Sequence, residues 1–225
     1  SSVCFKKHDL IMDEDISIIN TKTRNEKIKD FFLENKKSLI STIIVLILIL
    51  IGFYSYQLFK DGKKKEISNR YNSIVIEYQI GNELKVAQTL KEIVNAKDRT
   101  YSPLALYFII DNKLVKDKNE INDLFDVLID KTSLETEIKN LVIYKKALFN
   151  ADLFNELELL NILNPLINSN SIWRSHALYL MGEFFFNNGE YQKSKDFFQK
   201  IISIENSNSE IMINAQRRLN RDLSD

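Results

Sequence analysis

Hydrophobic residues form one long uninterrupted segment near the N-terminal end of the chain and recur periodically after it. Between Lys37 and Lys60 the sequence carries no charged residue, and it is predominantly apolar from Leu39 to Tyr56. A helix rises about 1.5 Å per residue, so about 20 apolar residues cross a hydrocarbon core of about 30 Å. The pattern predicts one transmembrane helix over residues 38–59, which would make the chain a single-pass membrane protein.

This apolar segment has two other interpretations, a buried core helix and a cleavable signal peptide. A soluble helix that is apolar on all sides over this length would need protein around it everywhere. A signal peptide has a shorter apolar region followed by small residues at its cleavage site. Here 26 residues lie between Met12 and Leu39, and the bulky Phe53, Tyr54 and Tyr56 close the segment. An uncleaved anchor is therefore the favoured interpretation.

After Lys65 the apolar residues recur every three or four positions, the period of an amphipathic helix. Breaks fall near residues 81, 117, 151 and 188, at intervals of about 34 to 38 residues. Such an interval is typical of stacked helical hairpins, because one hairpin cannot bury its apolar face alone. We predict an all-α fold in which residues 60–225 form a solenoid of about four hairpins with a C-terminal capping helix. An irregular helical bundle with evenly spaced turns is the alternative.

Local signals place the helices and their apolar stripes more closely. Ser102 is expected to be an N-cap with Pro103 in the first helical position, and Ser171 is expected to begin a helix that ends at Asn187. The predicted stripes are Ile67, Tyr71, Ile74 and Tyr78; Leu84, Ala87, Leu90 and Val94; Ile121, Leu124, Phe125 and Leu128; Leu141, Tyr144 and Leu148; and Phe154, Leu157, Leu160 and Leu163.

Composition supports helices and argues against several kinds of partner. Only 5 glycines and 2 prolines occur in 225 residues, which disfavours a fold of many strands and tight turns. The 31 basic and 31 acidic residues balance, so nothing indicates a nucleic-acid-binding protein. Cys4 is the single cysteine, which excludes an intrachain disulfide and a cysteine-based zinc site.

The residues that carry enzyme chemistry are scarce. His8 and His176 are the two histidines, and neither shows the partners of a metal site or a catalytic triad. Five glycines offer no phosphate-binding loop. Glu156 and Glu158 are interpreted as a solvated helix face, and Lys63–Lys65 as a contact with lipid headgroups. We expect no catalytic activity, cofactor, metal or small-molecule substrate.

The orientation of the anchor does not follow from charge. Within about 20 residues of the apolar segment, six basic residues lie on its N-terminal side and five on its C-terminal side. A long domain is translocated largely regardless of its charge, which favours residues 1–37 as a cytoplasmic tail. Ile28, Phe31 and Phe32 suggest a short amphipathic helix over Asn25–Lys37, and a lightly ordered tail is the alternative.

Ser175–Asn208 resembles a tetratricopeptide repeat. In that repeat the first helix of each pair lines a concave surface, so the resemblance implies a partner-binding groove that includes His176, Tyr179, Glu183, Phe186 and Asn187. The alternative is that Phe186 belongs to the core and the others are ordinary surface residues. Small residues let the two helices approach and aromatic residues fill their seam, and the positions that match this signature are Leu178, Gly182, Phe185, Gly189, Tyr191, Ser194 and Phe198.

The whole layout from Met12 is similar to the YfgM-like family of bacterial ancillary translocon subunits. It shares an acidic start, one anchor, a basic juncture and a helical-hairpin domain. The resemblance implies an inner-membrane protein whose N-terminus is cytoplasmic and whose repeat domain is periplasmic. It also implies the SecYEG translocon and periplasmic chaperones as partners. An assembly factor for another envelope complex, such as outer-membrane, cytochrome or cell-wall machinery, is the alternative.

Overall fold

The computed structural model describes residues 26, 28–79, 81–205 and 207–223. Cys4, His8, Met12 and most of the expected cytoplasmic tail lie outside these residues. The chain divides into two compact units, Ser1–Lys63 and Lys64–Asp225.

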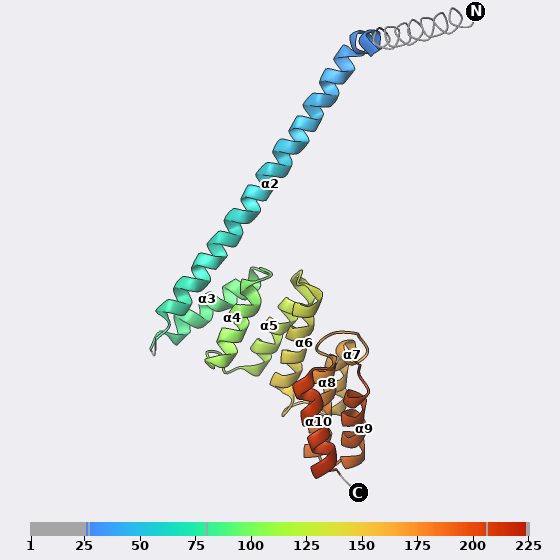
Figure 1. Ribbon diagram of the computed structural model, residues 1–225. Helices are drawn as coiled ribbons and strands as arrows, with labels where there is room; N and C mark the ends of the chain where they lie inside the picture. Colours follow the sequence, from blue (N-terminus) through green and yellow to red (C-terminus); the bar gives the residue numbers. More distant parts are fainter. Residues whose placement is uncertain (1–25, 27, 80, 206, 224–225) are drawn as a thin grey trace, which may run out of the picture. The chain divides into compact units, whose positions relative to one another are not determined.

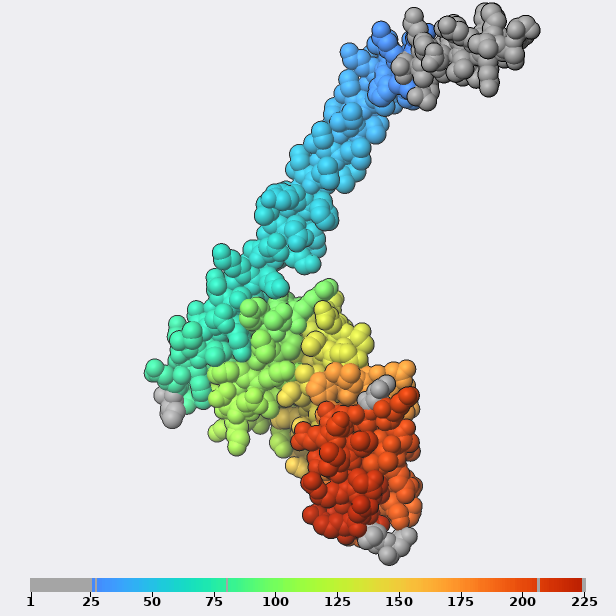
Figure 2. All heavy atoms as spheres, viewed as in Figure 1, coloured from blue at the N-terminus to red at the C-terminus, as the bar shows by residue number. Residues whose placement is uncertain are grey.

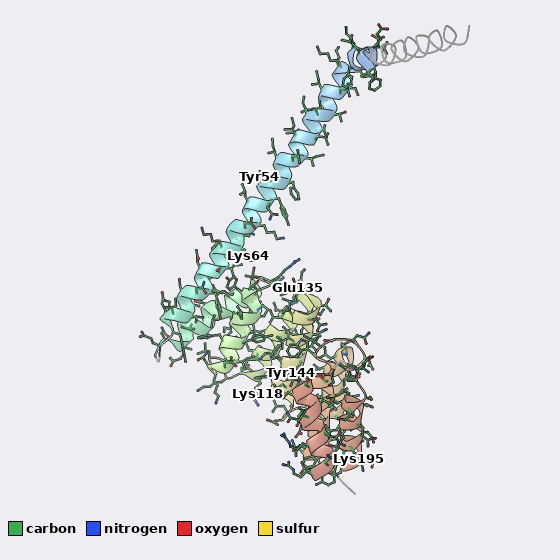
Figure 3. The ribbon with its side chains drawn as sticks, in the orientation of Figure 1. Tyr54, Lys64, Lys118, Glu135, Tyr144 and Lys195 are labelled. Carbon is green, nitrogen blue, oxygen red and sulfur yellow. The ribbon has the colours of Figure 1, made fainter. Side chains whose placement is uncertain are left out.

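The predicted anchor lies within helix α2, Lys36–Glu77, which is 42 residues long. Its apolar side chains around Tyr54 are exposed in every direction (Figure 3). By length and composition it is the one helix among the described residues that could cross a membrane. The helix does not end at the charged residues that follow Phe59, because Gly62 alone costs only about 1 kcal/mol in a helix and no proline accompanies it.

The second unit is a series of paired helices that follow one another along the chain, drawn from green to red in Figure 1. Each helix packs on the helix next to it along the chain and, in several cases, on the next but one. Packing between helices that are close along the chain confirms the predicted all-α solenoid. After the C-terminal end of α2, the helices are α3 (Glu83–Asn95), α4 (Tyr101–Asp111), α5 (Lys118–Lys131), α6 (Thr136–Asn150), α7 (Glu156–Ile167), α8 (Arg174–Asn187), α9 (Tyr191–Ile202) and α10 (Ser209–Arg221).

Three apolar clusters form the core of this unit, and each joins consecutive hairpins. The first runs from Ile74 of α2 to Val142 of α6, with Phe125 fully buried. The second joins α6, α7 and α8, and the third joins α8, α9 and α10. In the space-filling view the colours of this unit succeed one another from green through yellow to red, in sequence order (Figure 2). Each hairpin is therefore buried by its neighbours along the chain.

Two of the predicted stripes are each wrong at one leucine near the start of the stripe. Leu84 is 88% exposed and Leu157 is 68% exposed. Val86 and Leu159 are buried in their places. Each exposed leucine is the second residue of its helix and lies three positions before the next residue of its stripe. Three residues turn a helix by about 300°, which is about 60° short of a full turn, so the leucine points away from the buried face.

The two serines predicted to begin helices have other roles. Helix α4 begins at Tyr101, and the Asp98 carboxylate caps it by accepting from the backbone N–H groups of Thr100 and Tyr101 at 2.9 and 2.7 Å. The buried Ser102 hydroxyl instead donates to the Ile93 carbonyl at 2.7 Å, which ties α4 to α3. Ser171 lies three residues before α8, and its hydroxyl accepts from the Trp173 N–H at 3.1 Å.

Candidate partner-binding groove

Three hollows follow the first helices of the hairpins in the second unit. The first has a volume of about 370 Å³ and lies between the N-terminal ends of α4 and α6. The second, of about 200 Å³, lies between the C-terminal ends of the same helices. The third, of about 750 Å³, lies at the α6–α7 turn and the C-terminal end of α8. Tyr107 lines the first two hollows and Leu148 lines the last two, so together they form one groove.

Apolar side chains of α4 and α6 cover the floor of this groove. Leu104 and Ile138 are each 40% exposed, and Leu148 is 51% exposed. Leu141 lines the first hollow together with Leu104 and Ile138. Figure 3 labels two further positions of α6, Glu135 just before its start and Tyr144 near its middle. Large exposed apolar side chains in a concave surface are a feature of binding sites.

Two residues of the predicted stripe of α6, Leu141 and Leu148, line this groove, whereas Tyr144 packs against Trp173. Leu141 and Tyr144 are half-buried and Leu148 is exposed, whereas Val142 and Ala147 are fully buried. The first helix of a hairpin lies between its neighbours, so one apolar face packs in the array and another faces the groove. Periodicity alone cannot tell the two faces apart, because both repeat every three or four residues.

The third hollow is acidic. Its lining contains the four carboxylates of Asp152, Glu156, Glu183 and Glu190 and no basic side chain. Lys193 lies beside it and pairs with Glu156 and Glu190, both at 2.8 Å. The groove therefore changes from an apolar first hollow to a negatively charged third one.

Residues 29–151 match the tetratricopeptide repeat-like domain family, which is slightly more than half of the chain. This chain belongs to the tetratricopeptide repeat-like domain family. No curated protein and no solved structure matches it. The family match covers α2 to α6, the helices that build most of the groove floor. Tetratricopeptide repeat-like domains are protein-interaction folds, and their first helices line the concave surface.

The second unit brings only part of the predicted binding set into this groove. Glu183 and Asn187 line the third hollow. Tyr179 instead lines a small hollow of about 150 Å³ beside three arginines of α10. Phe186 lies under the Arg218 guanidinium, 4.6 Å from its ring centroid. Leu104, Tyr107, Ile138 and Lys145 also line the groove and were not predicted from the sequence; applying the first-helix rule to the earlier hairpins would have found them.

Arg218 of α10 contacts Glu183 and Phe186 on the surface of α8. It donates to both carboxylate oxygens of Glu183, at 2.7 and 2.5 Å, and to Asp222 at 2.8 Å. These acceptors raise the pKa of the guanidinium, with Glu183 the larger cause. Bidentate pairing of this kind fixes geometry as well as charge. The capping helix is thus held against α8 at its Glu183 position.

The repeat signature lies in the contact between α8 and α9. A side chain at Gly182 would place its first carbon 2.6 Å from the Phe198 ring, closer than any real contact. The Ser194 hydroxyl donates to the Gly182 carbonyl at 2.8 Å. Leu178, Phe185 and Phe198 are buried. Gly189 has φ of +76° in the turn, a conformation that side chains rarely adopt, and Tyr191 packs on Phe186 with ring centroids 5.4 Å apart.

The acidic residues considered for chemistry have structural partners. Glu158 and Asn155 form a capping box at the start of α7, with reciprocal bonds of 2.9 and 3.0 Å. Glu156 pairs with Lys193. Within the described part of the chain, no group of three or more histidine, cysteine or acidic side chains is placed to hold a metal ion.

Tyr107 carries an unpaired hydroxyl at the junction of the first two hollows. The hydroxyl oxygen is buried and has no hydrogen-bond partner among the described residues. Burial raises the pKa of Tyr107 to about 12. Lys145 lies over the ring, with its Nζ 4.7 Å from the ring centroid. An unpaired buried polar group costs about 1–3 kcal/mol.

We expect Tyr107→Phe to leave the free energy of unfolding unchanged or to raise it by about 1 kcal/mol, because the substitution removes that cost. Tyr101→Phe is the matched control on the same helix, since the Tyr101 hydroxyl accepts from Ser68 at 2.7 Å. That control should lose about 0.5–1.5 kcal/mol. Denaturant unfolding of the chain in detergent, followed by the fluorescence of its single tryptophan, Trp173, measures both. Equal destabilisation by the two substitutions would contradict the expectation.

His176 belongs to an aromatic cluster between α6 and α8. Its ring centroid lies 5.0 Å from that of Trp173 and 5.6 Å from that of Tyr144. Trp173 stacks on Tyr144 at 5.9 Å, and its indole N–H donates to the Glu137 carbonyl at 3.1 Å. Burial lowers the pKa of the imidazole, and the charge of Glu210 partly opposes this.

We expect the second unit to lose stability as the pH falls from 7.5 to 5. A lowered pKa means that the unfolded chain binds the His176 proton more readily than the folded chain. The loss therefore begins near the unfolded pKa of about 6.5 and grows toward lower pH. His176→Gln should reduce the dependence of stability on pH, measured as the change in denaturation midpoint between the two pH values. Identical changes in the variant and the original chain would exclude His176 as the cause.

Proposed function

We propose that this protein is a membrane-anchored interaction scaffold. The observation that carries the proposal is the groove of exposed apolar side chains along α4 and α6, in a chain that also has a helix able to cross a membrane. A groove of this kind binds a segment of another protein, and the anchor keeps that partner at the membrane surface. The scaffold needs no catalytic group to do this.

The more specific proposal is an ancillary subunit of the bacterial SecYEG translocon that links the channel to periplasmic chaperones. The similarity of the layout to the YfgM-like family supports it. It requires a cytoplasmic N-terminus and a periplasmic repeat-like domain at the inner membrane. Alkaline phosphatase fused to the C-terminus should then be active, because its disulfides form only in the periplasm. If only a reporter that works in the cytoplasm is active when fused to the C-terminus, the proposed orientation is wrong.

Site-specific photo-crosslinking tests the partner through the groove itself. A photoreactive residue replaces Ile138 or Leu148, which are exposed in the groove, and Leu157 serves as an apolar control on α7 that is even more exposed. In intact cells the groove positions should crosslink to translocon subunits or periplasmic chaperones, and the control should not. Recovery of outer-membrane, cytochrome or cell-wall assembly proteins would favour the second candidate, an envelope assembly factor. Products that are identical at all three positions would refute binding through the groove.

A further inference from the structure

We infer that the groove binds a protein segment that is apolar at one end and carries a lysine or arginine at the other. The inference rests on the proposed scaffold function and adds the chemistry of the bound segment. It comes from the change along the groove from an apolar lining in the first hollow, at Ile138, to an acidic lining in the third, at Asp152.

The first hollow suits large apolar side chains. Pro103, Leu104, Ile138 and Leu141 line it, and its volume of about 370 Å³ is open to the groove. One basic and one acidic residue, Arg99 and Glu135, are the charged residues of its lining and balance each other. Burial of apolar surface here yields about 25 cal/mol per Å², whatever the charge of the segment that supplies it.

The third hollow suits a cation. Its four carboxylates meet two neighbouring cations, Lys193 and Arg218, which leaves an excess of two negative charges. Asp152 is exposed and has no ion-pair partner in the described part of the chain. An incoming lysine or arginine would pair with it, whereas an acidic segment or an anionic lipid headgroup would be repelled.

The distance between the two ends sets the length of the segment. Ile138 and Leu148 are ten residues apart on α6, which corresponds to about 15 Å. A bound helix of about ten residues covers this distance, as does an extended segment of about five. The apolar and basic residues of the partner should show one of these two spacings.

Selection from a library of random peptides tests the inference with the full chain held in nanodiscs. Enriched peptides should combine a large apolar residue with a lysine or arginine at one of the two spacings. Peptides without basic enrichment, or no enriched peptides, would overturn the inference. If peptides without basic enrichment bind and Ile138→Ser abolishes their binding, the charge inference fails while the groove and the scaffold function stand. If basic peptides bind but crosslinking recovers neither channel nor chaperone, the translocon assignment fails instead.

A charge swap gives the sharper test. Asp152→Lys should weaken binding of a selected basic peptide about fivefold, and binding should recover when the peptide lysine is changed to glutamate. Asp123→Lys is the matched control, because Asp123 is exposed on α5 outside the groove. Leu157→Ser is the control for Ile138→Ser, since it removes an exposed apolar side chain elsewhere. Equal effects of Asp152→Lys and Asp123→Lys would overturn the assignment of the cation to the third hollow.

Discussion

Replacing Ile47 and Leu50 with arginine is expected to release the protein from the membrane. Both residues lie near the middle of the charge-free segment of α2, and both are exposed on the helix. An arginine at the centre of a membrane-spanning helix costs about 2.5–3.5 kcal/mol, so two should cost about 5–7 kcal/mol. That is enough to prevent stable insertion. Carbonate extraction followed by ultracentrifugation should move the double variant from the membrane pellet to the supernatant.

Two control variants make this result specific to the anchor. Ile47→Ala with Leu50→Ala keeps the segment apolar and should stay in the pellet. Leu157→Arg with Ile172→Arg adds the same charge at exposed positions of the second unit and should also stay in the pellet. If the double arginine variant of α2 also resists extraction, α2 is not what holds the protein at the membrane.

Phe198→Ala is expected to lower the free energy of unfolding by about 3–5 kcal/mol. The Phe198 ring is fully buried, fills the space above Gly182 and lies 5.3 Å from the Tyr179 ring. Its removal leaves a cavity in the third apolar cluster, which joins α8, α9 and α10. Denaturant unfolding in detergent measures the loss. Tyr191→Ala, at an exposed aromatic residue of the same helix, should cost much less.

A second substitution tests whether Gly182 and Phe198 act as a pair. Gly182→Leu alone should cost about 1–3 kcal/mol, because the new side chain collides with the ring. In the double variant the leucine can occupy the space that the ring has left, so the combined cost should be clearly below the sum of the two. Additive costs would show that the two positions are not coupled through this contact.

The helical hairpins were predictable because their turns are short and polar. The observed turns after Glu77, Asp111, Asn150 and Asn187 match the predicted breaks. The role of each apolar stripe was less predictable, since α6 has one face in the core and another in the groove. The stripe of α5 has only a buried face, and all of its predicted residues are buried. Ser102 was predicted as the N-cap of α4, but Asp98 caps that helix, and the sequence pattern did not single out Asp98.

The candidate site was harder to predict than the fold. The recognisable repeat signature lies in α8 and α9, so the predicted binding residues were taken from that hairpin. The groove floor lies mostly on α4 and α6, whose hairpins keep the length of the repeat and little of its signature. The pairing of Glu183 with Arg218 joins residues 35 positions apart, which no local pattern reports. It also places α10 beside Tyr179 and Phe186.

The position of α10 has a consequence for how copies of this protein meet. A stacked array of hairpins can in principle continue, because its last apolar face accepts another hairpin, including one from a second molecule. Here α10 covers that face with Ala215, and Arg218 binds it to Glu183. The outer side of α10 presents the polar Gln216, Arg217 and Asn220 to solvent together with Ile213, which is 54% exposed. By covering the apolar face that α8 and α9 share, α10 disfavours the stacking of a second copy's hairpin on that face.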